Sequence, residues 1–471
     1  MLFPTVEYAL FFLAAFAGAW SLAPWPRAHK TFLLFASWAF YAYGDWRFLP
    51  VLLGLSIEAG LVAQALALPL SERTRQWVLA AGITAALGTL ALFKYLGFFA
   101  SIVVTVTHSL GVIAWKPHLP ELALPVGVSF FTFHAISLMV DAWRRRIVVE
   151  VKLLDALLYV AFFPQLVAGP ILRASSFLPT LATPRSPGDL DTARALQRIV
   201  LGLFKKVIVA QVLASELVDP VFDDPQAHDS LTVLLGVYAY AAQIYCDFSG
   251  YTDLAIGSAL LLGYPMPENF DAPYRADSPR DFWRRWHLSL STWLRDYLFI
   301  PLGGSRGNAS RTAAALAMTM VLGGLWHGAA WTFVAWGAFH GAWLVLHRSW
   351  SATKSTVSFR ASLAWRVFAP VLTFHFVCIG WVLFRSTSFA GALEVFSAIA
   401  QVPTSMPSLA LTALVALGVA LAAMPKEAMD RVHLQVARWP AVAQGVAFGL
   451  ILVALDALGP RGISPFIYFQ F

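Results

Sequence analysis

Charged residues are scarce in this chain. They make up 13% of the sequence, whereas a soluble domain usually carries about 25%. Hydrophobic residues reach 59%, and the mean hydropathy is +0.67. A soluble fold of this size cannot bury so much apolar surface. The composition therefore excludes an ordinary cytosolic enzyme and a disordered protein, and it predicts an all-α integral membrane protein.

Cysteine is also scarce, since Cys246 and Cys378 are the two copies in the chain. Two cysteines cannot build a disulfide framework or a cysteine-based metal site, so we expect no metal. The sequence also lacks a G-x-S-x-G elbow, a P-loop, an H-E-x-x-H motif and a Rossmann glycine fingerprint. These absences count against a hydrolase, a nucleotide-driven pump and a metalloprotease. Acyl transfer from an activated thioester by a histidine base needs none of these motifs.

The chain carries a moderate excess of basic residues, 33 Lys and Arg against 26 Asp and Glu. The excess lies in short loops between apolar runs, where it indicates membrane topology rather than nucleic-acid binding. No Lys or Arg precedes the first apolar run, and Glu7 lies near its start, so we expect the N-terminus outside. Residues 271–311 carry seven arginines against four aspartates, and we expect them in the cytoplasm.

Long apolar runs divide the whole sequence, as membrane helices of about 20 residues require. The runs span about residues 6–24, 31–44, 48–69, 77–107, 122–142, 153–172, 196–217, 231–263, 312–326, 328–347, 363–384, 408–424 and 441–459. Several are short or broken by Gly and Pro. We therefore expect about 11 membrane helices plus re-entrant or interfacial pieces, in one polytopic domain over residues 1–471.

The segment from Asp281 to Asp296 has a two-faced pattern. On a helix at about 100° per residue, one face carries Phe282, Trp286, Leu290, Trp293 and Tyr297. The opposite face carries Arg284, His287, Ser291 and Arg295. One interpretation is an interfacial helix with its arginines toward lipid phosphates. The other is a cationic wall for an anionic cofactor, with His287 among its polar groups, and the spacing alone leaves both open.

A single histidine, His327, lies in the otherwise apolar run from Gly323 to Trp331. Small residues on both sides allow another backbone or a substrate to approach closely. A desolvated imidazole tends to stay neutral, as a general base must, although it can equally be bonded to a neighbouring helix carbonyl. His340 follows about 220° further around a continuous helix, so we expect the two rings not to share a face.

An ordered set of motifs runs along the sequence: Phe93–Tyr95, Leu124–Phe130, Phe163–Pro170, Tyr245–Tyr251, Asn269–Tyr274, Phe282–Tyr297, Ile300–Gly304, Leu325–Gly328, Trp381–Arg385 and Pro465–Phe471. Together these motifs resemble the membrane-bound O-acyltransferase (MBOAT) family, in the bacterial branch that includes the alginate O-acetylation membrane protein. Any one of them is weak, but the ordered set is specific. The resemblance implies a ring of membrane helices around a thin central partition that is pierced by a tunnel.

The resemblance also implies roles for particular residues. His327 matches the signature histidine of the family, the general base, and His287 matches the second polar position of the active site. The donor implied is cytosolic acetyl-CoA, and Arg284, Arg285, Arg295 and Ser291 are the residues expected near it.

The implied function is O-acetylation of an extracytoplasmic polysaccharide, alginate or a similar exopolysaccharide, from the bacterial inner membrane. Relatives work with a periplasmic partner of the SGNH esterase-like type, and we expect such a partner here in addition to the lipid bilayer. Peptidoglycan, cellulose or teichoic-acid acylation uses the same residues and stays open. A passive transporter or polysaccharide channel, with histidines lining its pore, is the alternative from another class.

Overall fold

The computed structural model describes residues 1–111, 122–183, 186–351 and 362–460. Over these ranges the chain consists of helices and connecting turns, without a β-strand, which confirms the all-α prediction. The closing motif, Pro465–Phe471, lies outside the described residues.

The chain divides into two compact units, and each is described by itself. The first comprises Met1–Leu190 with Ala259–Met266, and the second comprises Asp191–Ser258 with Pro267–Phe471. The expectation of a single domain over the whole chain stays a prediction.

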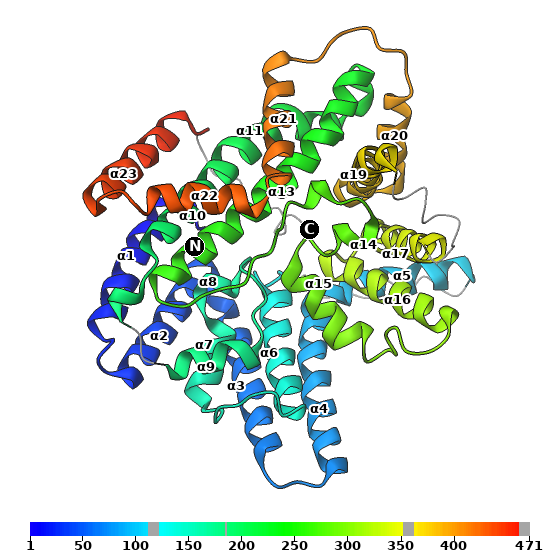
Figure 1. Ribbon diagram of the computed structural model, residues 1–471. Coiled ribbons are helices and arrows are strands. Elements are labelled where there is room, and N and C mark those ends of the chain that lie inside the picture. The colour runs from blue at the N-terminus through cyan, green and yellow to red at the C-terminus, as the bar shows by residue number, and fades with distance from the viewer. Residues whose placement is uncertain (112–121, 184–185, 352–361, 461–471) are drawn as a thin grey trace. The chain divides into compact units, whose positions relative to one another are not determined.

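The first unit is built from a series of apolar helices (Figure 1). They are α1 (Val6–Ser21), α2 (Pro26–Asp45), α3 (Leu49–Ala67), α4 (Glu72–Leu90), α5 (Leu96–Ser109), α6 (Val128–Trp143), α7 (Leu153–Ala161), α8 (Phe163–Leu166) and α9 (Ala174–Ala182). Helices α3, α4 and α6 run side by side. His29 is buried between two partners, the Ala19 carbonyl at 2.8 Å and the Tyr264 hydroxyl at 3.1 Å. His29 therefore connects α2 with α1 and with the segment that contains Tyr264.

The second unit contains both predicted active-site histidines. Its helices are α10 (Thr192–Leu203), α11 (Gln211–Leu213), α12 (Asp219–Asp223), α13 (Ser230–Leu261, whose last turn enters the first unit), α14 (Pro279–Phe282), α15 (Leu288–Leu294), α16 (Ala309–His327), α17 (Trp331–Ser351), α19 (Leu363–Arg385), α20 (Phe389–Ile399), α21 (Leu409–Ala422), α22 (Lys426–Val436) and α23 (Ala441–Leu458). Helices α16 and α17 form a hairpin (Figure 1).

Among the described residues, five helical stretches are long and apolar enough to cross a membrane, or six if a pair bent by 90° counts as one span. The five are Pro26–Ala67, Glu72–Ser109, Ser230–Leu261, Leu363–Arg385 and Ala441–Leu458, and the bent pair is Leu409–Ala422 with Lys426–Val436. Shorter apolar helices accompany them, including Val6–Ser21 and Val128–Trp143. The chain is thus a multi-pass membrane protein, while the expected total of about 11 crossings stays a prediction.

Candidate active site

The α16–α17 hairpin places His327 at the last residue of α16. Glycines allow the two helices to pack backbone against backbone. A Cβ atom on Gly324 would lie 2.2 Å from the Phe333 carbonyl oxygen, and one on Gly337 would lie 2.3 Å from the Met320 carbonyl oxygen. Such distances are far inside van der Waals contact, so only glycine permits this approach.

Substitution of Gly324 by alanine is expected to destabilise the protein by about 1–3 kcal/mol, as overpacking does, although alanine is the better helix former. The thermal midpoint of the purified protein in detergent measures the effect. Gly445→Ala in α23 is the matched control, because nothing lies within 4 Å of a Cβ atom there. A Gly324→Ala protein as stable as the wild type would show that the hairpin tolerates a wider spacing.

The His327 imidazole is buried among aromatic rings, as the apolar run around it predicts. The residue is 4% exposed. Its ring centroid lies 5.0 Å from that of Trp326, 5.1 Å from Trp336 and 5.3 Å from Phe384. Edge-to-face contacts of this kind hold a ring in one orientation.

His287 lies in the turn between α14 and α15, with a left-handed backbone at φ 43°. It is fully buried, and its ring stands edge-to-face on Phe248 at 4.5 Å. Neither of its ring nitrogens has a hydrogen-bond partner in the described part of the chain. Burial lowers the pKa of His287, because desolvation disfavours the charged ring. A neutral imidazole can both donate and accept a proton.

The two histidines come together at one tryptophan. The Trp326 ring centroid lies 5.0 Å from that of His327 and 6.1 Å from that of His287. The sequence separates these histidines by a turn and two helices, so the fold is what brings them to the same indole. Their catalytic roles stay predictions.

The expected amphipathic helix from Asp281 to Asp296 is not continuous. Helix α14 ends at Phe282, and α15 begins only at Leu288. Four of the five residues on the predicted apolar face are buried: Phe282, Trp286, Leu290 and Trp293 are 6% exposed or less, whereas Tyr297 is half-buried. The predicted polar stripe does not form, however, because the turn directs His287 into the core while Arg284 and Arg295 are exposed.

Three of the four residues predicted to bind the donor, Arg285, Arg295 and Ser291, have hydrogen-bond partners within the protein. Arg285 Nε donates to Asp281 at 2.8 Å, and Arg295 Nε donates to Asp296 at 2.7 Å. Ser291 Oγ donates to the Trp286 carbonyl at 3.0 Å. Arg284 is exposed, and the described residues offer it no ion pair. Arg284 is therefore the cation of this group that is most available to a ligand.

Asn269 is a residue that sequence reasoning missed, although it opens one of the quoted motifs. It is fully buried. Its carbonyl accepts from the Leu288 N–H at 2.9 Å, its Oδ1 accepts from the Ser289 N–H at 3.2 Å, and its Nδ2 donates to Thr252 at 3.3 Å. Asn269 thus caps the start of α15 and holds the backbone directly after His287.

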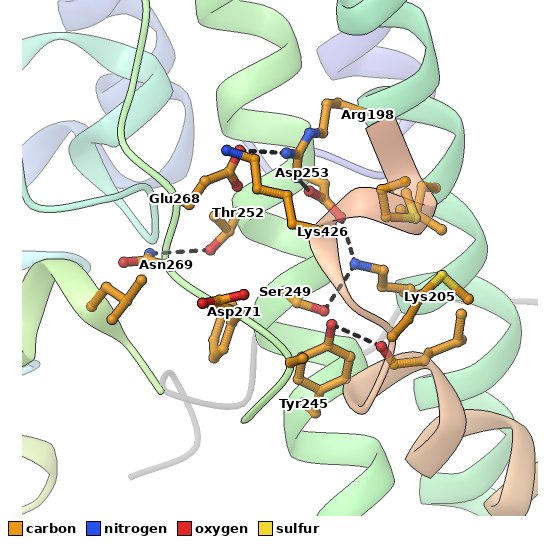
Figure 2. A pocket seen from close by; sticks show the side chains of 17 residues that line it. Arg198, Lys205, Tyr245, Ser249, Thr252, Asp253, Glu268, Asn269, Asp271 and Lys426 are labelled. Carbon is orange, nitrogen blue, oxygen red and sulfur yellow. Dashed lines mark hydrogen bonds and ion pairs between the residues drawn. The ribbon is translucent and has the colours of Figure 1, made fainter. Parts of the chain in front are cut away.

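Asn269 also lines a cavity of about 240 Å³ (Figure 2). Arg198 bridges Asp253, at 2.7 Å, and Glu268. Lys205 reaches Asp253 at 2.6 Å and Ser249 at 3.2 Å. Burial raises the pKa of the Glu268 carboxyl, and the Arg198 cation opposes this shift. The cavity is lined by both charged and apolar side chains, and its charged groups are largely paired with one another.

The next residue, Lys206, forms a second buried ion pair, with Asp247 of α13. The side chains are 3% and 4% exposed. Both lysines lie in a π-helical turn, Phe204–Ala210, which brings consecutive side chains to the same partner helix. Asp247 directly precedes Phe248, so this pair fixes the part of α13 that packs on His287.

Metal ligands are not gathered in this region. Within the described ranges, no group of three or more His, Cys, Asp or Glu residues is placed to hold a metal ion.

The described fold and site define an all-α, multi-pass membrane protein with two buried histidines at a common aromatic centre. Residues 74–390 match the model of the MBOAT, membrane-bound O-acyltransferase family. The chain belongs to this family, and it is an acyltransferase.

Several curated relatives are similar over most of the chain. A protein named probable alginate O-acetylase AlgI from Azotobacter vinelandii is 35% identical, with 100% of both chains covered. Its namesake from Pseudomonas aeruginosa is 38% identical over 84% of this chain and 74% of its own. A peptidoglycan O-acetyltransferase of Helicobacter pylori is 33% identical over 79% of this chain and 73% of its own.

Proposed function

We propose that the chain transfers an acetyl group from acetyl-CoA toward a hydroxyl group of an extracytoplasmic polysaccharide, with alginate or a similar exopolysaccharide as the acceptor. The observation that carries the proposal is the pair of buried histidines in contact with Trp326. Full-length similarity to a protein named as an alginate O-acetylase supports this acceptor. Acetyl-CoA is charged and does not cross a bilayer. A membrane protein that passes only the acetyl group across would therefore supply it to the extracytoplasmic side.

In the proposed reaction, His327 accepts the proton of the acceptor hydroxyl, or of a relay group, while that group attacks the thioester carbonyl carbon. The carbon–sulfur bond then breaks, and the proton passes from His327 to the leaving thiolate, which gives CoA. His287 orients or polarises the carbonyl, or shares the proton. The low pKa of His287 supports this role, because a neutral ring carries the N–H and the lone pair that it needs.

The phosphates of the donor are proposed to lie near Arg284, Arg285, Arg295 and Ser291. Exposed arginines recognise phosphate through planar, multidentate hydrogen bonds. Arg284 is exposed and Arg295 is 58% exposed at its side chain, so both are accessible. Arg285 would have to share its guanidinium with Asp281.

The proposed setting is the bacterial inner membrane, with the N-terminus outside and residues 271–311 in the cytoplasm. We further propose that a periplasmic partner of the SGNH type completes the transfer to the polysaccharide. Acetylated polysaccharide made by the purified chain without any partner would count against this dependence.

Peptidoglycan is the second candidate acceptor, and the Helicobacter pylori relative favours it. A teichoic acid D-alanyltransferase of Streptococcus thermophilus is also similar, at 31% identity, but over only 50% of this chain. The acceptor can be decided by offering each polymer, with the partner, to membranes that contain the chain.

The experiment that tests the proposed function is turnover of radiolabelled acetyl-CoA by the purified protein in detergent. We expect release of CoA by the protein alone, and transfer of label to an acceptor hydroxyl once the polysaccharide and its periplasmic partner are added. A passive transporter or channel would leave the thioester intact, and that result would overturn the proposal.

A further inference from the structure

Three nitrogen-bearing rings lie together beside His327: Trp336 and His340, which are buried, and Trp283, which is half-buried with its indole Nε1 inside the protein. Their centroids are separated by 5.7 Å (Trp283 to Trp336), 5.3 Å (Trp283 to His340) and 4.9 Å (Trp336 to His340). Trp336 is 1% exposed and His340 is fully buried. Within the described ranges, neither ring nitrogen of His340 and neither indole Nε1 has a hydrogen-bond partner.

The burial of ring nitrogens without hydrogen-bond partners is unfavourable and therefore requires an explanation. A buried polar group without a partner costs about 1–3 kcal/mol, and a phenyl ring would fill the place of His340 without that cost. The two indoles can only donate, whereas a neutral imidazole has one donor and one acceptor. One water molecule matches the two indole donors and the imidazole acceptor, because its oxygen accepts both indole N–H groups and it donates one hydrogen to the unprotonated imidazole nitrogen. Buried waters typically make about three hydrogen bonds of this kind.

Gly380 of α19 leaves one side of the cluster without a side chain. A Cβ atom at this position would lie 2.8 Å from His340 Nε2 and 3.5 Å from Trp336 Cδ1. Glycine in a helix interior is unfavourable by roughly 0.5–1 kcal/mol relative to alanine. Its presence here keeps the polar edge of His340 free of a methyl group.

The cluster is connected to both active-site histidines. The Trp336 ring packs edge-to-face on His327 at 5.1 Å. Trp283 begins the turn that ends at His287. His327 and His340 therefore contact the same indole, although a continuous helix would separate them, because the chain reverses between α16 and α17.

We propose that Trp283, Trp336 and His340 hold one internal water molecule, and that His340 thereby acts as a positioning residue for His327 and for the turn of His287. This inference rests on the proposed function for its kinetic consequence, but not for the water itself.

The test compares His340→Phe, which keeps the ring shape and removes both nitrogens, with His340→Gln, which keeps a donor and an acceptor. We expect His340→Phe to lower kcat about tenfold or more, since small misplacements of reacting groups are costly. The KM for acetyl-CoA should stay within about twofold, and His340→Gln should recover much of the loss. Gly380→Ala, which places a methyl group at the site, should reproduce the kcat defect.

His347→Phe is the matched control, two turns further along α17 and part-exposed beside Trp350, and it should leave kcat unchanged. A map that resolves waters supplies a readout independent of activity. It should show one water between the three rings in the wild type and none in His340→Phe. An empty site in the wild type, or wild-type kcat in His340→Phe, overturns the inference. A wild-type protein that holds the water but turns over no acetyl-CoA overturns the proposed function instead.

Discussion

Replacement of His327 by alanine is expected to lower the rate of acetyl transfer at least about a hundredfold. A positioned general base contributes about 10²–10⁴-fold to a rate. The rate of CoA release from acetyl-CoA, measured with saturating acceptor, gives the effect directly. KM for acetyl-CoA should change much less, because the base acts on the acceptor proton in the transition state.

His375→Ala is the control for loss of a histidine elsewhere in the same unit. His375 bonds the Tyr238 hydroxyl at 2.9 Å and the Val371 carbonyl at 2.7 Å, away from the Trp326 centre. The His375→Ala protein should retain near-wild-type turnover. Insertion and thermal midpoint of both variants must match the wild type for the comparison to hold. Full activity in a well-folded His327→Ala protein would end the general-base assignment.

Removal of Lys206 is the second change with a large expected effect. Lys206→Met leaves the Asp247 carboxylate in the core without this cation, and breaking a buried ion pair in this way costs about 3–5 kcal/mol. We expect a lower thermal midpoint and weaker acyl transfer, because Asp247 adjoins the Phe248 ring that packs on His287. Thermal unfolding in detergent, followed by the turnover assay, measures both.

The neighbouring lysine offers a matched comparison. Lys205→Met also removes a buried cation, but Asp253 keeps Arg198 at 2.7 Å, so its loss should fall below the about 3–5 kcal/mol of a fully broken buried pair. The double variant Lys206→Met/Asp247→Leu should regain most of the stability, because apolar replacement of both partners is often neutral or stabilising. A loss of about 3–5 kcal/mol in Lys205→Met would contradict the view that Arg198 compensates the Asp253 carboxylate.

Local sequence patterns were sufficient for the helices and for the burial of the main aromatic residues. The apolar run around His327 predicted a desolvated imidazole, and His327 is buried; Phe282, Trp286 and Trp293, which the spacing placed together on one face, are buried as well. Both predictions depend on neighbours in the sequence and on the preference of apolar side chains for the core.

The turn at His287 could not be predicted in the same way, because its cause lies some 15–20 residues earlier in the sequence. The Asp271 N–H donates to the Arg285 carbonyl at 3.0 Å, and the Leu288 N–H donates to the Asn269 carbonyl at 2.9 Å. These tertiary hydrogen bonds interrupt the helix that periodicity favours and turn His287 inward. The pairing of Lys206 with Asp247 likewise joins two helices, and no local pattern indicates it.

The most direct test of the central claim is a structure of the chain in a lipid bilayer with a non-hydrolysable acetyl-CoA analogue. The account predicts that the acyl carbonyl, and the place from which the acceptor oxygen attacks it, lie within hydrogen-bond reach of His327, about 2.6–3.2 Å or one water away. It also predicts that the phosphates of the analogue lie beside Arg284. An analogue that binds with its acyl end remote from both His327 and His287 would contradict it.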